Sequence, residues 1–198
     1  SHLSNKWRIN NNHLLIELIG LRILSERINW HPKSERWKRK SQSMLESEIE
    51  KQTIDGRNWE PTTSYHKLIT EGMLVLFNQL SDEQRKKGPG IVFVEKTREL
   101  VKTLAMITDS SGKMPLVGDD DGGTMLPLFD GVEIKDNSEV LQLANKMGFQ
   151  IEIKDKIVKF WEGQGMGVIR DGEDYIHFVA GAPDGEFRQG SHRHLDML

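Results

Sequence analysis

The 198-residue chain contains no cysteine, and this absence narrows the chemistry that it can carry out. Without thiols there are no disulfide scaffolds, no cysteine nucleophiles and no cysteine-ligated zinc, so any metal ion must be bound by His, Asp or Glu. Long apolar runs are also missing. None approaches the roughly 20 residues that span a bilayer, and no signal-peptide pattern opens the sequence. We therefore expect no membrane insertion.

An excess of positive charge is missing as well. The 27 Lys and Arg residues stand against 30 Asp and Glu residues, which gives a net charge of −3. Proteins that bind nucleic acid are usually basic, so the balance predicts no nucleic-acid partner. The most basic segment, residues 33–40, is interpreted as the solvated face of a helix, with contact to an anionic polymer as the alternative.

Before about residue 150, the apolar residues mostly follow helical spacing. The spacing predicts a buried helix after the capping residues Asn11 and Asn12, and an outer helix over 35–52 with a sparse apolar stripe of Trp37, Met44, Leu45 and Ile49. Further helices are predicted from Thr62 or Thr63 to Leu80, over 92–108 and over 138–147. Residues 53–61 and 114–128 predict loops. Alternating inner and outer helices are typical of stacked helical hairpins.

From residue 150 the apolar period changes to two, which predicts strands over 157–161, 166–170 and 175–180. Asp171-Gly172 lies between the last two and predicts a tight hairpin. The fold class is therefore α+β, with helices followed by an antiparallel sheet. Residues 190–198 look like the entry to another strand, so we expect the chain to be partial.

Two helix starts carry residues suited to proton transfer or anion binding. Asn12-His13 opens the first helix, where Glu17 lies one turn further on and could orient His13; a cap followed by a buried histidine is the alternative. Ser64-Tyr65-His66 opens the third helix. The positive field at a helix start favours a phenolate, so Tyr65 is expected to transfer protons more readily there, unless it only packs at the helix entry.

Two further motifs could hold cations. The loop Gly118-Asp119-Asp120-Asp121-Gly122 suggests calcium, but Thr124 and Asp130 occupy the positions where an EF-hand needs Gly and Glu, so a solvated acidic turn is the alternative. His192-x-His194-x-Asp196 places alternate side chains of a strand on one face, in a combination that suits zinc. That pattern also occurs in metal-dependent hydrolases.

These motifs occur in the same order in one known family. The elements are Asn12-His13, Asp55-Gly56 with Glu60 and Ser64-Tyr65-His66, the acidic glycine loop 118–122, and the motif 190–196. The chain resembles the heparinase II/III-type polysaccharide lyases, which include alginate and heparan sulfate lyases. The resemblance implies that residues 1–148 are the later part of an (α/α) toroid, here incomplete, and that residues 149–198 are the first strands of a β-sandwich.

The resemblance also implies an activity and roles for individual residues. The substrate would be an acidic polysaccharide or oligosaccharide, cleaved by β-elimination at a uronic acid. Asn12 and His13 match residues that neutralise the uronate carboxylate, Tyr65 the proton donor to the leaving oxygen, and His192 the base. His194 matches a ligand of a structural zinc ion whose other ligands would lie beyond residue 198. The residues expected around the substrate are Glu17, Glu60, His66, Asp119 and Asp121.

The family resemblance further implies a periplasmic or extracellular location. Two alternatives to a lyase stay open. One is a protein of the same fold that binds glycan, or takes part in polysaccharide assembly, without catalysis. The other is the zinc-dependent hydrolase suggested by the histidine pair.

Overall fold

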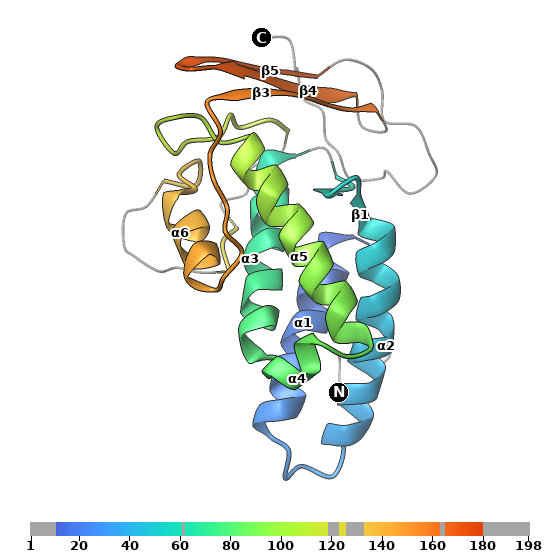
Figure 1. Ribbon diagram of the computed structural model, residues 1–198. Helices are drawn as coiled ribbons and strands as arrows, with labels where there is room; N and C mark the ends of the chain where they lie inside the picture. Colours follow the sequence, from blue (N-terminus) through green and yellow to red (C-terminus); the bar gives the residue numbers. More distant parts are fainter. Residues whose placement is uncertain (1–10, 61, 119–122, 126–132, 163–164, 180–198) are drawn as a thin grey trace.

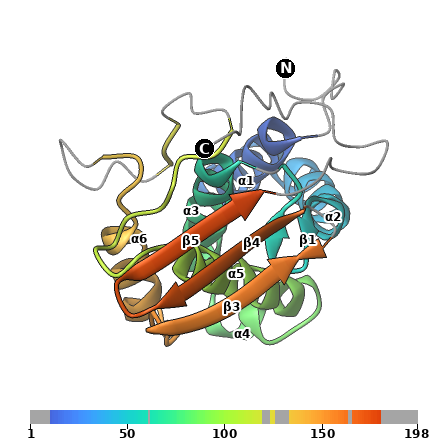
Figure 2. The same ribbon diagram turned by 90° about the horizontal axis from the view of Figure 1, so that it is seen from above.

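The computed structural model describes residues 11–60, 62–118, 123–125, 133–162 and 165–179. Helices lie beneath one face of a small antiparallel sheet (Figures 1 and 2), which confirms the expected order of helices followed by strands. The elements are α1 (Asn12–Arg27), α2 (Ser34–Gln52), β1 (Thr53–Ile54), β2 (Arg57–Asn58), α3 (Thr63–Gln79), α4 (Asp82–Arg85), α5 (Pro89–Met106), α6 (Ser138–Lys146), β3 (Lys156–Trp161), β4 (Met166–Asp171) and β5 (Asp174–Val179). None of the described helices is both long and apolar enough to cross a membrane.

A first hydrophobic core joins α1, α2, α3 and α5. Its fully buried members include Leu15, Leu18, Ile19, Leu45, Ile49, Ile69, Met73 and Leu100. The predicted inner helix is confirmed, because α1 contributes residues from several sides, and α2 contributes only a stripe. Trp37 is the exception to the predicted stripe. Its ring stacks on His31 at the α1–α2 loop, with centroids 4.7 Å apart, instead of entering this core.

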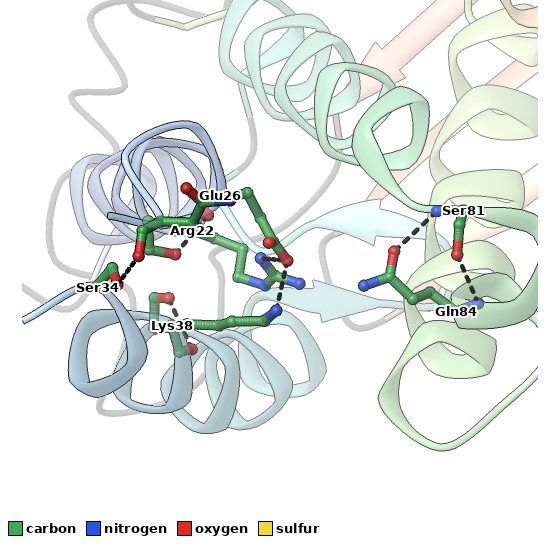
Figure 3. Close-up of polar contacts among 9 residues, drawn as sticks. Arg22, Glu26, Ser34, Lys38, Ser81 and Gln84 are labelled. Carbon is green, nitrogen blue, oxygen red and sulfur yellow. Dashed lines mark hydrogen bonds and ion pairs between the residues drawn. The ribbon is translucent and has the colours of Figure 1, made fainter. Parts of the chain in front are cut away.

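Polar contacts also hold α1 against α2. Arg22 on α1 and Lys38 on α2 both contact the carboxylate of Glu26, at 2.6 Å and 2.9 Å (Figure 3). The same view shows Ser81 and Gln84 at the start of α4, where each side chain bonds the backbone N–H of the other residue. This capping box explains a short helix that apolar spacing alone does not predict.

A second core joins the sheet to the helices. Trp161, Met166 and Val168 from the strands pack with buried residues of α3, α5 and α6, among them Leu74, Leu104 and Ala144. The described strands therefore share their core with the helices. A domain boundary between residues 148 and 149 stays a prediction.

Hydrogen bonds fasten the sheet to the carboxyl end of α5. Arg170 on β4 donates to the carbonyls of Met106, at 3.0 Å, and of Thr108. Tyr175 on β5 donates its hydroxyl proton to the carbonyl of Ile107 at 2.7 Å. The last carbonyls of a helix lack partners within the helix and carry partial negative charge, so a guanidinium is well suited to cap them.

The three strands are ordered β3-β4-β5 and pair antiparallel, with Trp161 opposite Met166 and Asp171 opposite Asp174. The tight hairpin predicted at Asp171-Gly172 is confirmed, with Gly172 at φ +65°. The sheet face turned away from the helices carries exposed apolar side chains. Val158 is 83% exposed and Ile176 is 58% exposed, beside the stacked pair Phe160 and Phe178.

The predicted loop at 53–61 is partly wrong, because its first six residues form the β1–β2 hairpin. Thr53 pairs with Asn58, and Asp55 and Gly56 form the turn with positive φ angles of 51° and 74°. Positive φ at both central positions is the signature of a type I′ turn, for which Asp-Gly is a preferred sequence. Strands of two residues are too short to show an alternating pattern.

Gly56 offers a test of how tightly this hairpin is held. A Cβ atom there would need φ +74° and would lie 3.2 Å from Thr103 Oγ1 and 3.4 Å from Glu99 Cβ. We expect Gly56→Ala to lower the free energy of unfolding by about 1–2 kcal/mol, because the backbone is strained and α5 is crowded.

Gly20→Ala is the matched control. Gly20 lies within α1, and its added Cβ meets nothing within 4 Å. This variant should raise the free energy of unfolding by about 0.5–1 kcal/mol, since Ala favours helix. Urea unfolding measures both changes, and equal effects of the two substitutions would contradict the packing described for the hairpin.

Candidate functional site

Three of the residues predicted to act on a substrate, Asn12, His13 and Tyr65, lie where helices begin. Figure 1 shows that α1 and α3 both start at the end of the helical layer that faces the sheet, and that the β1–β2 hairpin lies at this same end. Helix starts expose unpaired N–H groups and a positive field, and both favour bound anions. The topology therefore brings two of the predicted motifs to one end of the molecule.

Glu60 links the two helix starts. Its carboxylate Oε1 accepts a hydrogen bond from the backbone N–H of Asn12 at 3.2 Å, and both residues are buried, at 3% and 4% exposure. Glu60 itself lies between the hairpin and α3. A carboxylate at a helix start is stabilised by the helix dipole. The contact thus joins two predicted residues that are 48 positions apart in the sequence.

His13 faces solvent instead of being buried. Its backbone N–H donates to the capping side chain of Asn11 at 3.1 Å, which confirms the predicted cap. Glu17 is also exposed, and in the described part of the chain no hydrogen bond or ion pair joins it to His13. The expected orientation of His13 by Glu17 is therefore wrong for this structure, and the imidazole is open to solvent.

Tyr65 lies in the first turn of α3 and is half-buried. Thr62 caps this helix, with its hydroxyl oxygen accepting from the backbone N–H of Tyr65 at 3.3 Å. The predicted helix start is confirmed, and so is the position of the phenol within the field of that start. A role for Tyr65 in proton transfer stays a prediction.

His66, the next residue, is fully buried and bridges three elements. Its Nδ1 accepts from the backbone N–H of Asn58 on β2 at 3.2 Å, and its Nε2 lies 3.1 Å from the carbonyl of Leu100 on α5. This pattern places the proton on Nε2. Burial, together with the charge of Arg57, lowers the pKa of His66 to about 3. The structure thus gives His66 a role in holding the hairpin, and its contact with substrate stays a prediction.

The acidic loop is anchored to α3 on both sides. Before it, Thr63 donates its N–H to the carbonyl of Val117 at 3.1 Å and accepts from the N–H of Val117 at 3.0 Å. After it, the carboxylate of Glu71 accepts from the hydroxyl of Thr124 at 2.9 Å and from the N–H of Met125 at 2.6 Å. Asp119 and Asp121 themselves lie outside the described residues, as do His192 and His194. Across the part that is described, no group of three His, Asp or Glu side chains could hold a metal ion.

Arg57 is a candidate that sequence reasoning missed. It lies on β2 and is completely buried, yet none of its three guanidinium nitrogens has a hydrogen-bond partner among the described residues. Its guanidinium carbon lies 5.4 Å from the centre of the Trp161 ring, which fills the space above it. Burial lowers the pKa of Arg57 to about 9, so the side chain still carries its charge at neutral pH.

Polar groups without partners are found on the sheet above Arg57. Trp161 Nε1 and His177 Nε2 are both buried and lack hydrogen-bond partners within the described chain. Burial and the Arg57 charge lower the pKa of His177 to about 4. An indole N–H and a guanidinium can only donate, so an anion or a hydroxyl oxygen is the ligand that would satisfy them. The one signal in the sequence was a cation next to an Asp-Gly turn, and that signal does not report burial.

The pKa of His66 predicts how stability depends on pH. An unfolded histidine titrates near pH 6.5, so between about pH 6.5 and pH 3 the unfolded chain binds more protons than the folded chain. Stability must therefore fall as the pH falls through this window, and His66 alone accounts for about 2 kcal/mol between pH 6.5 and pH 5. Urea unfolding at several pH values measures the slope. The slope should be shallower in His66→Gln, and a flat wild-type curve would contradict the burial of a neutral imidazole.

Comparison with known proteins identifies the family of this chain. A family model described as the heparinase II/III N-terminus matches residues 1–142. A search of curated proteins found no match. The fold is similar to that of the heparan sulfate lyase HepC from Pedobacter heparinus, with a TM-score of 0.60 and 20% identity over 94% of this chain and 31% of that one. It is also similar to a crystal structure of heparinase III, with a TM-score of 0.60 and 14% identity over 85% of this chain and 29% of that one.

The chain therefore spans only about three tenths of the length of these solved structures. The match to the family model covers well over half of the chain, across the helical layer and both helix starts that carry the candidate residues. The chain belongs to the heparinase II/III family.

Proposed function

We propose that the protein cleaves an acidic polysaccharide by β-elimination at a uronic acid. The observation that carries the proposal is the buried hydrogen bond from Asn12 to Glu60, because it joins the helix start bearing Asn12 and His13 to the segment that leads into Tyr65. Family membership supports the same conclusion. One of the similar structures is named a heparan sulfate lyase.

In the proposed reaction, a base removes the proton from C5 of the uronate. The electron pair of that bond forms the C4–C5 double bond, and the bond from C4 to the glycosidic oxygen breaks. Tyr65 supplies the proton that the leaving oxygen needs, and on one stereochemical course it first takes the C5 proton itself. On the other course His192 is the proposed base. Proton transfer by a positioned group contributes about 10²–10⁴-fold to such rates.

The step becomes feasible only if the carboxylate can carry the charge that develops on it. We assign this neutralisation to Asn12 and to the solvent-facing imidazole of His13. Asn12 would act through its side-chain amide N–H groups, because its Oδ1 atom is an acceptor and cannot donate to a carboxylate. Glu17, Glu60, Asp119 and Asp121 are proposed to lie around the sugar.

Arg57 adds a fixed positive charge beneath the hairpin. A charge in a low-dielectric interior acts over several ångströms without direct contact, because little water screens it. We propose that this field stabilises the negative charge that develops in the intermediate, relative to the bound substrate. An unpaired buried cation normally costs folding free energy, which is the kind of cost found at functional sites.

The finer architecture belongs to the same proposal. The apolar outer face of the sheet, with Val158 and Ile176 exposed, supports a second β-sheet packed on it and hence a β-sandwich. We likewise propose that the helices form part of an (α/α) toroid. A structural zinc ion bound in part by His194 and a periplasmic or extracellular location complete the proposal, and metal analysis of the purified protein tests the zinc.

Tyr65→Phe tests the chemistry directly. In a protein that includes the whole chain, we expect formation of the unsaturated product to fall by about 10²-fold or more, because the leaving oxygen loses its acid. Ultraviolet absorbance of the new C4–C5 double bond measures turnover on a panel of uronate polymers. Tyr175→Phe, at the only other tyrosine, should keep its turnover. A polymer that binds without giving product would favour a glycan-binding protein instead.

Arg57→Met separates an electrostatic role from a structural one. If the charge acts on the reaction, kcat should drop by about tenfold while the free energy of unfolding stays equal or rises, because a buried unpaired charge is replaced by an apolar side chain. Lys159→Met is the control, since Lys159 is a second cation near the Trp161 ring, at 5.7 Å, but is paired with Asp55. A loss of stability in Arg57→Met with unchanged kcat would remove Arg57 from the mechanism.

A further inference from the structure

The end of the helical layer opposite the sheet carries an unusual aromatic group. Trp30, in the α1–α2 loop, is 77% exposed, although tryptophan is buried on average in folded proteins. Its ring meets the ring of His31 edge-on, with centroids 6.1 Å apart, and His31 in turn stacks flat on Trp37 at 4.7 Å. Three rings thus follow one another from the half-buried Trp37 to the exposed Trp30.

The ring of His31, which Trp30 meets, is itself held in place. The ring of His31 is fixed by the backbone N–H of Lys33, which donates to its Nδ1 at 3.1 Å, and by the stack on Trp37. Trp30 lies against this fixed ring and offers an exposed, flat apolar face to solvent.

Cations of α2 lie beside these rings. Residues 33–40 contain five Lys or Arg and one Glu, in a chain with a net charge of −3. Successive helical residues are about 100° apart, so Lys33, Arg36 and Lys40 fall on the same side of α2 as Trp37, whereas Glu35 falls on another side. Among the described residues no carboxylate forms an ion pair with Lys33 or Arg36. Lys38 is different, because it points to Glu26 on α1 (Figure 3).

We propose that Trp30, His31, Lys33, Arg36 and Trp37 form a second binding surface for acidic polysaccharide, distant from the helix starts. The face of a pyranose ring packs on an exposed indole, and cations pair with the carboxylate or sulfate groups of the same chain. The choice of polysaccharide as occupant rests on the proposed function. Nucleic acid also combines stacking with negative charge, so single-stranded DNA is included in the test as a competing ligand.

The distance between the two sites means that only a long polysaccharide can bind both of them at once. Trp30 follows the end of α1, whereas Asn12 begins it, and a 16-residue helix is roughly 24 Å long. A short oligosaccharide cannot reach both sites. A long chain bound at the Trp30 surface would be held near the helix starts at high local concentration, which strengthens its binding without any new contact there.

The test uses the Tyr65→Phe protein, so that bound polymer is not cleaved. Calorimetric titration with heparan sulfate and with alginate, each as long chains and as short fragments, measures the dissociation constants. Trp30→Ala and Arg36→Glu should each weaken binding of the long chains of at least one polymer by about tenfold, and leave the binding of short fragments at the helix starts unaffected. Trp30→Phe should restore most of the affinity, and Lys146→Glu, the same kind of charge change on α6, should have no effect.

Three results would overturn the surface. The first is that Trp30→Ala binds the long chains as tightly as the starting protein does. The second is that the starting protein binds neither polymer. The third is that Trp30→Ala loses affinity only for single-stranded DNA, used as a competing ligand. The proposed function fails by a different measurement, namely the absence of unsaturated product from the protein with Tyr65 intact. The two failures are therefore distinguishable.

Discussion

The buried hydrogen bond between Glu60 and the first N–H of α1 is the contact on which the candidate site depends. It ties the segment after the β1–β2 hairpin to the start of another helix, and it satisfies a donor that no helix can satisfy internally. The carboxylate is 3% exposed, so it has exchanged its hydration for contacts within the protein. Removing such an acceptor would leave buried donors unpaired, which costs more than the bond contributes.

Buried hydrogen bonds and close packing also hold the other side of the hairpin. The neutral ring of His66 accepts from β2 and donates to α5, and the turn at Gly56 lies against Thr103 of α5. These contacts come from different helices and converge on six residues. These contacts hold β2 where Arg57 is fully buried, with its guanidinium over the Trp161 ring.

The sequence predicted the longer helices and the three strands of the larger sheet, for reasons that are local, but it missed α4 and the β1–β2 hairpin. Asn11 and Thr62 carry capping side chains that act within three residues, and the change of apolar period at residue 150 appears along a single element. What it could not predict depends on distant packing. The ring of Trp37 fits a core stripe by spacing but is taken up by His31, and the burial of Arg57 depends on a strand about 100 residues later. The order of the motifs along the chain could be recognised from the sequence. The exposure of His13 and the full burial of His66 could not be predicted from it.

The histidines of the site illustrate why placement decides chemistry. His66 is fully buried and His177 is half-buried, and burial together with the Arg57 charge holds both pKa values far below 6.5. Neither imidazole can carry positive charge at neutral pH, so neither can neutralise a uronate in that way. Arg57 and the two helix starts supply positive charge at this end of the molecule, and the ring of His13 faces solvent. Burial, reinforced by the charge of Arg57, thus keeps His66 and His177 neutral, whereas the exposed imidazole of His13 is placed to meet a substrate.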